Sequence, residues 1–174
     1  ELSMENIGWD GQSFVDLNNR PIQNLFKLYP WEWIWEESFS QYLSPQTNWI
    51  EPCWKMLLSN KAILVELWKR YPNHPLLVET HHFDPQQKLS GKWVKKPILA
   101  REGANIRVLQ DGQDQGAASG SFYFDDYDKY GYVVQKWVDT PLFAGQLPTL
   151  GLWMVGHQCA GMSIREDCYD IIGN

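Results

Sequence analysis

The chain has 174 residues, 44% hydrophobic and 21% charged, which suits a soluble globular protein with one domain or two small subdomains. Its net charge of −6 argues against a nucleic-acid backbone as main partner, because proteins that bind one usually present a basic face. No apolar run approaches the roughly 20 residues of a membrane span, and three cysteines without a CxxC pair indicate reduced thiols in a cytoplasmic protein.

The first half of the chain predicts a short hairpin and two helices. Turn residues predict the hairpin over residues 8–20. Apolar residues at helical spacing predict a helix over 31–43, with its tryptophans in the core. Ser59 or Asn60 can cap the second helix, which is expected to end at about 67–70 before a proline-rich stretch.

The second half reads as strands. We expect strands over 93–99 and 106–110, joined by a glycine-containing turn. Gly, Ser and Asp are frequent in 113–131, which predicts a long mobile loop. A further strand is predicted over 132–138, and a hairpin over 149–165. Helices followed by antiparallel strands indicate an α+β fold.

The most suggestive polar pattern is a lysine on a strand that leads into a small-residue turn. Lys96 precedes the turn 101–105, which contains Gly103 and Ala104. Small residues let backbone amides approach a phosphate closely, and a lysine on the entering strand adds a positive charge. An ordinary hairpin with solvated charges explains the same pattern.

Two other charged positions are candidates for anion binding. Lys61 lies at the start of a predicted helix, where the helix dipole mildly disfavours a cation, so an anionic partner or simple solvation can account for it. Arg165, followed by Glu166 and Asp167, suits charge stabilisation at a strand end, or forms a surface charge cluster. The adjacent His81 and His82 argue against a shared metal ion, because strand neighbours point to opposite faces.

Taken together, the motifs along the chain resemble one family. They are Gly8-Trp9-Asp10, Asn24 through Glu32, Trp49 through Pro52, Leu58 through Leu64, Lys96-Pro97, Arg101 through Asn105, Gln135 and Gly161 through Asp167. This succession is similar to the C-terminal part of the glutathionylspermidine synthase family, above all its stand-alone bacterial members that lack the amidase. Both ends of the chain favour a fragment of a longer protein.

The resemblance implies a circularly permuted, partial ATP-grasp-like fold and an ATP-dependent carboxylate–amine ligase that works through an acyl phosphate. It further implies small-molecule acid and amine substrates, such as glutathione and a polyamine. By the same resemblance, residues 1–58 belong to the central synthetase region, 59–134 to the lid subdomain and 135–174 to the nucleotide-binding core.

The family also implies a role for each matching position. Arg165 would be catalytic, stabilising the transferring phosphoryl group. The nucleotide-binding residues would be Lys61, Lys96, Glu102, Gly103, Ala104, Gln135, Lys136, Trp137, Val138, Asp170, Ile171 and Ile172.

Three departures from the family pattern bear on activity. The resemblance implies that the Arg-x-Asp and Glu-x-Asn motifs that hold Mg²⁺ lie upstream of this segment, so we expect no metal site here and no ligation by the segment alone. Lys136 replaces a frequent second Gln, and the 113–131 segment is longer and more aromatic than usual. A non-catalytic module that binds a nucleotide or another protein is therefore the alternative.

Overall fold

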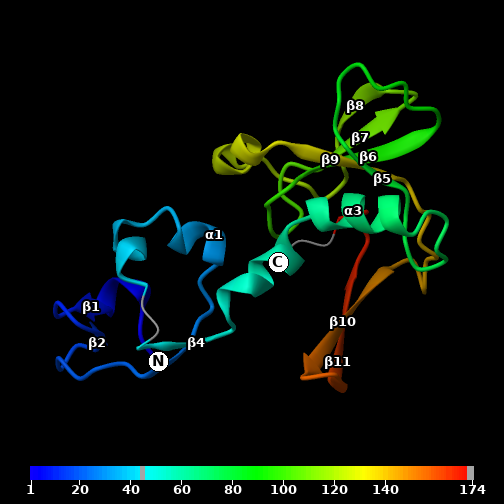
Figure 1. The fold of residues 1–174 in the computed structure, drawn as a ribbon. Coiled ribbons are helices and arrows are strands. Elements are labelled where there is room, and N and C mark those ends of the chain that lie inside the picture. The colour runs from blue at the N-terminus through cyan, green and yellow to red at the C-terminus, as the bar shows by residue number, and fades with distance from the viewer. Residues whose placement is uncertain (44–45, 172–174) are drawn as a thin grey trace. The chain divides into compact units, whose positions relative to one another are not determined.

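A computed structural model describes residues 1–43 and 46–171 of the chain (Figure 1). It has two compact units, Glu1–Ser59 and Asn60–Asn174, which are taken one at a time below. Among the helices of these described ranges, none is long and apolar enough to cross a membrane.

The first unit is built from short elements. The hairpin predicted over 8–20 is confirmed by the antiparallel pairing of β1 with β2, and β3 pairs with β4 in parallel. In chain order the elements are η1 (Met4–Asn6), β1 (Gly8–Trp9), β2 (Phe14–Val15), β3 (Asn24–Phe26), α1 (Trp31–Ile34), η2 (Ser38–Tyr42), β4 (Asn48–Ile50), η3 (Cys53–Lys55) and α2 (Met56–Ser59).

The continuous helix predicted over 31–43 is wrong. Helix α1 ends at Ile34, and Glu37 is extended (φ −73°, ψ 147°) before the 3-10 turn η2. The Tyr29 hydroxyl donates to the Glu37 carboxylate at 2.7 Å, and the Tyr42 ring stacks on Trp9 with centroids 4.9 Å apart. Contacts with the β1–β2 hairpin and with Tyr29 thus override the local helical periodicity.

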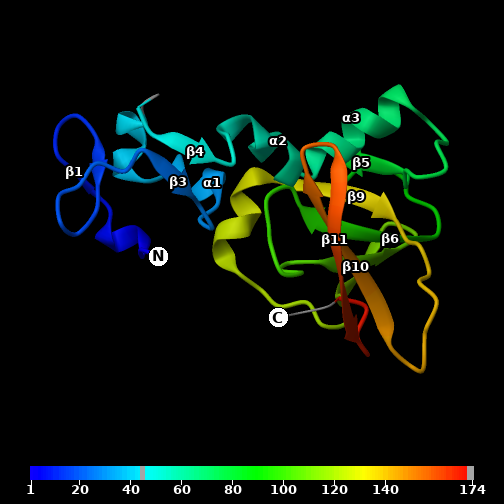
Figure 2. The ribbon, with the colours of Figure 1, turned by 90° about the horizontal axis from the view of Figure 1, so that it is seen from below.

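The second unit centres on a five-stranded antiparallel sheet in the order β5-β9-β6-β7-β8, with α3 packed along β5 (Figure 2). Helices combined with antiparallel strands confirm the α+β class. In chain order the elements are α3 (Ala62–Arg70), β5 (Thr80–His82), β6 (Lys92–Pro97), β7 (Arg107–Gln110), β8 (Gln113–Ala117), η4 (Asp125–Tyr130), β9 (Tyr132–Lys136), β10 (Leu147–Val155) and β11 (Gln158–Asp167).

Both faces of the sheet are covered around β6 and β9. Successive side chains of a strand point to opposite faces, yet Val133 and Val134 are both almost completely buried. One face carries a cluster of Leu89, Trp93, Leu109 and Val134, and a second cluster contains Val94, Ile106 and Ala118. Strands covered on both faces hold their side chains firmly in place.

Helix α3 begins slightly later than predicted. Its first residue is Ala62, whose amide donates to the Asn60 side-chain oxygen at 2.9 Å. Ser59 instead donates its hydroxyl to the carbonyl of Met56 at the end of α2. Asn60 therefore performs the capping interaction, which satisfies an amide that would otherwise lack an intrahelical partner.

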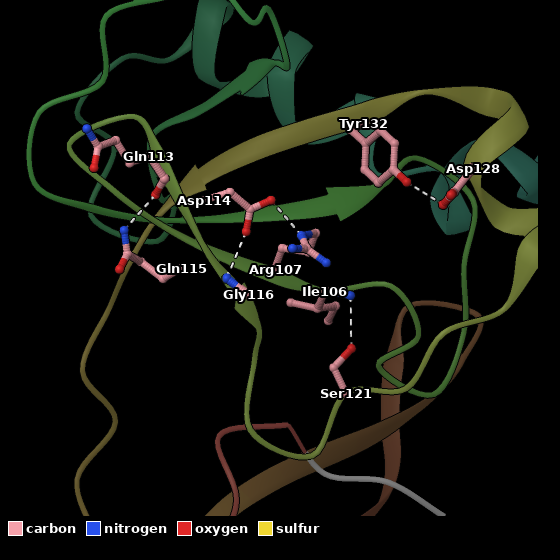
Figure 3. Close-up of polar contacts among 9 residues, drawn as sticks. All are labelled: Ile106, Arg107, Gln113, Asp114, Gln115, Gly116, Ser121, Asp128 and Tyr132. Atoms are coloured by element: carbon pink, nitrogen blue, oxygen red, sulfur yellow. Dashed lines mark hydrogen bonds and ion pairs between the residues drawn. The ribbon is translucent and has the colours of Figure 1, made fainter.

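The prediction of a long mobile loop over 113–131 is wrong, because the segment contains β8 and η4 and is tied down by polar contacts (Figure 3). Asp114 on β8 accepts a hydrogen bond from the Arg107 side chain of β7 at 2.6 Å. The Ser121 hydroxyl accepts from the Ile106 amide at 2.9 Å. Residues with weak strand propensity are here held by a turn at Asp111-Gly112 and by side-chain hydrogen bonds.

The hairpin predicted over 149–165 is confirmed as β10 and β11, which are joined at Gly156-His157 and pair from Leu147 to Val155 with a register shift between Trp153 and Met154. In Figure 1 it extends away from the five-stranded sheet. From Leu150 onward, its large apolar side chains stay more than half exposed.

Candidate functional site

The sheet places Lys96 and Gln135 on one face. Gln135 of β9 lies opposite Val94 of β6, and Lys96 follows two residues after Val94. Cross-strand partners share a face, as do residues two apart on a strand. The Lys96 ammonium accordingly donates a hydrogen bond to the Gln135 side-chain oxygen at 2.8 Å.

A pocket of about 450 Å³ opens beside this pair. Seven positions singled out in the sequence line it: Lys96, Gln135, Lys136, Trp137, Val138, Asp170 and Ile171. The remaining lining residues are Val78, Val94, Asp139, Thr140, Leu142, Leu147 and Cys168. A concave site of this size with a few convergent polar groups is typical of small-molecule binding.

The pocket brings both signs of charge together. Burial lowers the pKa of Lys96, because removing water disfavours the charged amine. The Lys92 ammonium lies 3.4 Å from the centre of a Trp137 ring, and the Trp137 indole N–H donates to the Asp139 carboxylate at 2.8 Å. Trp137 is therefore held from two sides, with its orientation fixed by charged neighbours.

The turn 101–105 approaches the pocket through Ile171. Glu102 is exposed and Ala104 buried, and both Glu102 (φ 57°) and Gly103 (φ 75°) adopt the left-handed conformation. A Cβ atom added to Gly103 would overlap the Ile171 side chain, which itself lines the pocket. Glycine is thus required here by both backbone conformation and space.

Asn105 ties this turn to the aromatic segment that follows β8. Its side-chain nitrogen donates to the Phe124 carbonyl at 2.8 Å and to the Asp128 carboxylate at 2.7 Å, while its side-chain oxygen accepts from the Phe124 amide at 2.7 Å. The Tyr132 hydroxyl also donates to Asp128 (Figure 3), and this hydrogen bond holds the pKa of Asp128 below its usual value.

Lys61 and Arg165 do not line the pocket. The Lys61 backbone amide donates to Ile98 and its ammonium to the Ala100 carbonyl, each at 3.0 Å, so Lys61 braces the segment that leads into the turn 101–105. Arg165 is exposed on β11 opposite Thr149. Ile172 lies outside the described residues.

Three polar residues at or beside the pocket were not singled out from the sequence: Thr80, Asp139 and Thr140. Thr80 is completely buried and its hydroxyl oxygen accepts from the Gln135 side-chain nitrogen at 3.1 Å. No local pattern marks it, because its partner lies 55 positions away in the chain.

No group of three or more His, Cys, Asp or Glu side chains that could hold a metal ion occurs within residues 1–43 and 46–171. The pocket itself offers two carboxylates, Asp139 and Asp170. Mg²⁺ prefers several oxygen ligands, so this donor set falls short of a dedicated magnesium cage.

Comparison with known proteins gives a consistent result. The family model for the glutathionylspermidine synthase preATP-grasp region matches residues 1–174. A putative acid–amine ligase of Haemophilus influenzae is 45% identical over all of this chain and 46% of its own length. A trypanothione synthetase of Crithidia fasciculata is 25% identical over 91% of this chain, which covers 27% of that enzyme.

A bifunctional glutathionylspermidine synthetase/amidase of Escherichia coli is 24% identical over 94% of this chain and 30% of its own length. The chain thus spans less than half the length of each of these three relatives.

Proposed function

The chain belongs to the glutathionylspermidine synthase family, and we propose that it is the nucleotide-binding part of an ATP-dependent carboxylate–amine ligase. The observation that supports this proposal is the shared pocket. Lys96 and Gln135, which lie far apart in the sequence, are hydrogen-bonded there next to the Lys136–Val138 backbone and to Asp170 and Ile171.

Each lining group has a role that its chemistry suits. Lys96 contacts phosphate oxygens as a point charge, since a lysine ammonium is a compact donor. Gln135, Trp137 and Val138 border the base, which needs an apolar slot with a few polar edges. Asp170 accepts hydrogen bonds from ribose hydroxyls, because an ionised carboxylate is an acceptor only.

The turn 101–105 would cover the phosphates, with Glu102, Gly103 and Ala104 presenting backbone at close range. Lys61 would brace this turn through its hydrogen bond to the Ala100 carbonyl and would contact the nucleotide. Arg165 would stabilise the transferring phosphoryl group, and Ile172 would continue the nucleotide-side strand. Phosphoryl transfer depends mostly on such positioning and charge stabilisation.

The proposal includes a circularly permuted ATP-grasp fold, with 1–58 in the central synthetase region, 59–134 as the lid and 135–174 as nucleotide-binding core strands. The relatives' names point to glutathione and polyamine-type substrates. The Mg²⁺ that family members use would be held by residues upstream of this chain, so we expect this chain alone to bind ATP without turnover.

Thermal unfolding with and without ATP or ADP tests the proposal. A ligand that binds only the folded chain raises the melting temperature, and a concentration of about 100 times Kd adds about 2.7 kcal/mol. Lys96→Ala is expected to remove most of this protection. Lys95→Ala is the matched control, because Lys95 neighbours Lys96 on β6 but packs over the Phe83 and Tyr132 rings. No protection of the wild type at millimolar ATP, or equal losses in both variants, would refute it.

Ligase activity is tested separately in the full-length protein. We expect ADP release only when an acid such as glutathione and an amine such as spermidine are both present, with the amide product detected by mass spectrometry. ATP protection without any acid- and amine-dependent ADP release would favour the alternative of a non-catalytic nucleotide-binding module.

A further inference from the structure

A three-residue hydrogen-bonded relay lies under the pocket and ends at Lys96. Thr80 faces Gln135 across the β5–β9 ladder, and Gln135 faces Val94 across the β9–β6 ladder. Thr80, Gln135 and Lys96 therefore share one sheet face. Their side chains connect at 3.1 Å (Gln135 nitrogen to Thr80 oxygen) and 2.8 Å (Lys96 nitrogen to Gln135 oxygen).

The hydroxyl of Thr80 has a single hydrogen, which it donates to the Val78 carbonyl at 2.8 Å. Toward Gln135 its oxygen can then act only as an acceptor. Gln135 must present its NH₂ group to Thr80, which turns the amide oxygen toward Lys96. A side-chain amide has no intrinsic preference between its two orientations, so its neighbours decide which one is populated.

The opposite orientation is disfavoured at both ends. It would place the amide NH₂ against the Lys96 ammonium, which has donors only. At the other end the amide oxygen would demand the Thr80 hydrogen and leave the Val78 carbonyl without it. Thr80 is completely buried, so water cannot replace a lost partner without a cavity for it.

We propose that Thr80 is a positioning residue for nucleotide binding: it fixes the orientation of the Gln135 amide, so that the amide oxygen holds the Lys96 ammonium in place and charged. This deepens the proposed function and rests on it. The pocket's other ionisable groups are Lys136, Asp139, Cys168 and Asp170. Burial works against the charged amine, and an acceptor oxygen opposes that effect.

The test measures the Lys96 pKa directly, without nucleotide. Competitive acetylation over a pH series, read by peptide mass spectrometry, gives the midpoint for Lys96 against exposed Lys88 as the internal reference. Thr80→Val keeps the shape and removes the hydroxyl. It is expected to lower the Lys96 midpoint and raise the neutral fraction by about three- to tenfold at a fixed pH. Thr80→Ser, which keeps the hydroxyl, is expected to retain the wild-type midpoint.

A second set of variants, made in Gln135→Glu, distinguishes an effect of the Thr80–Gln135–Lys96 relay on Lys96 from a general effect of Thr80→Val on packing. In Gln135→Glu, either carboxylate oxygen can accept from Lys96, so adding Thr80→Val is expected to leave the Lys96 midpoint unchanged. If Thr80→Val does not fold, Gln135→Leu must lower the midpoint instead. An unchanged midpoint in every folded variant, or an equal shift with Thr80→Ser, overturns the proposal.

ATP binding is then measured on the same variants. Thr80→Val is expected to weaken binding, and more so at alkaline than at neutral pH, because Lys96 loses its proton earlier. If the midpoint shifts but the wild type does not bind ATP, the relay stands and the nucleotide role fails. If ATP binds and Thr80→Val changes neither quantity, Thr80 has no positioning role.

Discussion

The five-stranded sheet and the β10–β11 hairpin both carry residues of the proposed site, but the chain secures them very differently. Lys96 and Gln135 lie on the central strands β6 and β9, whose apolar residues are buried on both faces of the sheet. Arg165 lies on a hairpin whose two strands pair only with each other, and from Leu150 onward the large apolar side chains of this hairpin are more than half exposed. A two-stranded hairpin is marginally stable by itself. The sheet thus fixes the position of the Lys96 and Gln135 side chains. The hairpin fixes only the register of Arg165.

The sharpest test of this difference is a matched pair of leucine truncations. Leu109 is 2% exposed within the cluster of Leu89, Trp93 and Val134, whereas Leu152 of the hairpin is 62% exposed. Leu109→Ala is expected to cost about 2–5 kcal/mol of unfolding free energy, because it leaves a cavity. Leu152→Ala is expected to change it by less than about 0.5 kcal/mol. Urea unfolding followed by circular dichroism gives both values.

Comparable losses from the two truncations would break the comparison, because they would mean that the hairpin's apolar side chains are covered in solution. Leu150→Ala, on the same strand and similarly exposed, serves as a second measurement.

The local signals in the sequence predicted the 8–20 and 149–165 hairpins, helix α3 and the strands β6, β7 and β9 well, but they misjudged residues 31–43 and 113–131. The turn residues at Gly156-His157 act over two or three positions, so their effect can be predicted without knowledge of the fold. The helix expected over 31–43 fails because Tyr42 packs on Trp9, far away in the chain. Strand β8 lacks apolar alternation and depends on Asp114 meeting Arg107.

The residues of the site also divide into those that sequence motifs reveal and those that only long-range contacts reveal. Lys96 was singled out from its strand–turn pattern and again by the family motifs, Gln135 by the family motifs alone, and both line the pocket. Thr80 escaped notice because an isolated buried threonine has no chemical signature until the ladder places it against Gln135. Residues whose role is created by register cannot be recognised before the register is known.

After β11, the chain is again held firmly, because Ile171 contacts the five-stranded unit. Alanine substitutions at two glycines test how firmly it is held. The Ile171 amide donates to the Ser119 carbonyl at 2.9 Å, and a Cβ added to Gly120 (φ 84°) would overlap the Ile171 carbonyl oxygen. Gly116 has a similar conformation (φ 108°) but open space around it. Gly120→Ala is expected to cost about 1–3 kcal/mol more than Gly116→Ala, since both carry the backbone strain and only one carries the clash.

Thermal or urea unfolding of the two variants gives the difference. Equal losses of unfolding free energy in the two variants would show that Ile171 moves away from Gly120 without a penalty. Ile171 would then not be held firmly against the segment 119–120.

Arg165→Ala is expected to have the smallest effect on this chain. Arg165 is exposed and does not line the pocket, so the loss of its side chain is expected to change stability by less than about 0.5 kcal/mol and leave the ATP-induced rise in melting temperature intact. Lys96→Ala, measured alongside, is expected to remove that rise. In the full-length protein, the proposed ligase activity gives a second readout: Arg165→Ala is expected to lower kcat much more than nucleotide affinity, because a group that acts only in the transition state contributes little to ground-state binding. If Arg165→Ala instead removes ATP protection in this chain as fully as Lys96→Ala does, the hairpin folds over the pocket in solution and the contrast between the two regions disappears.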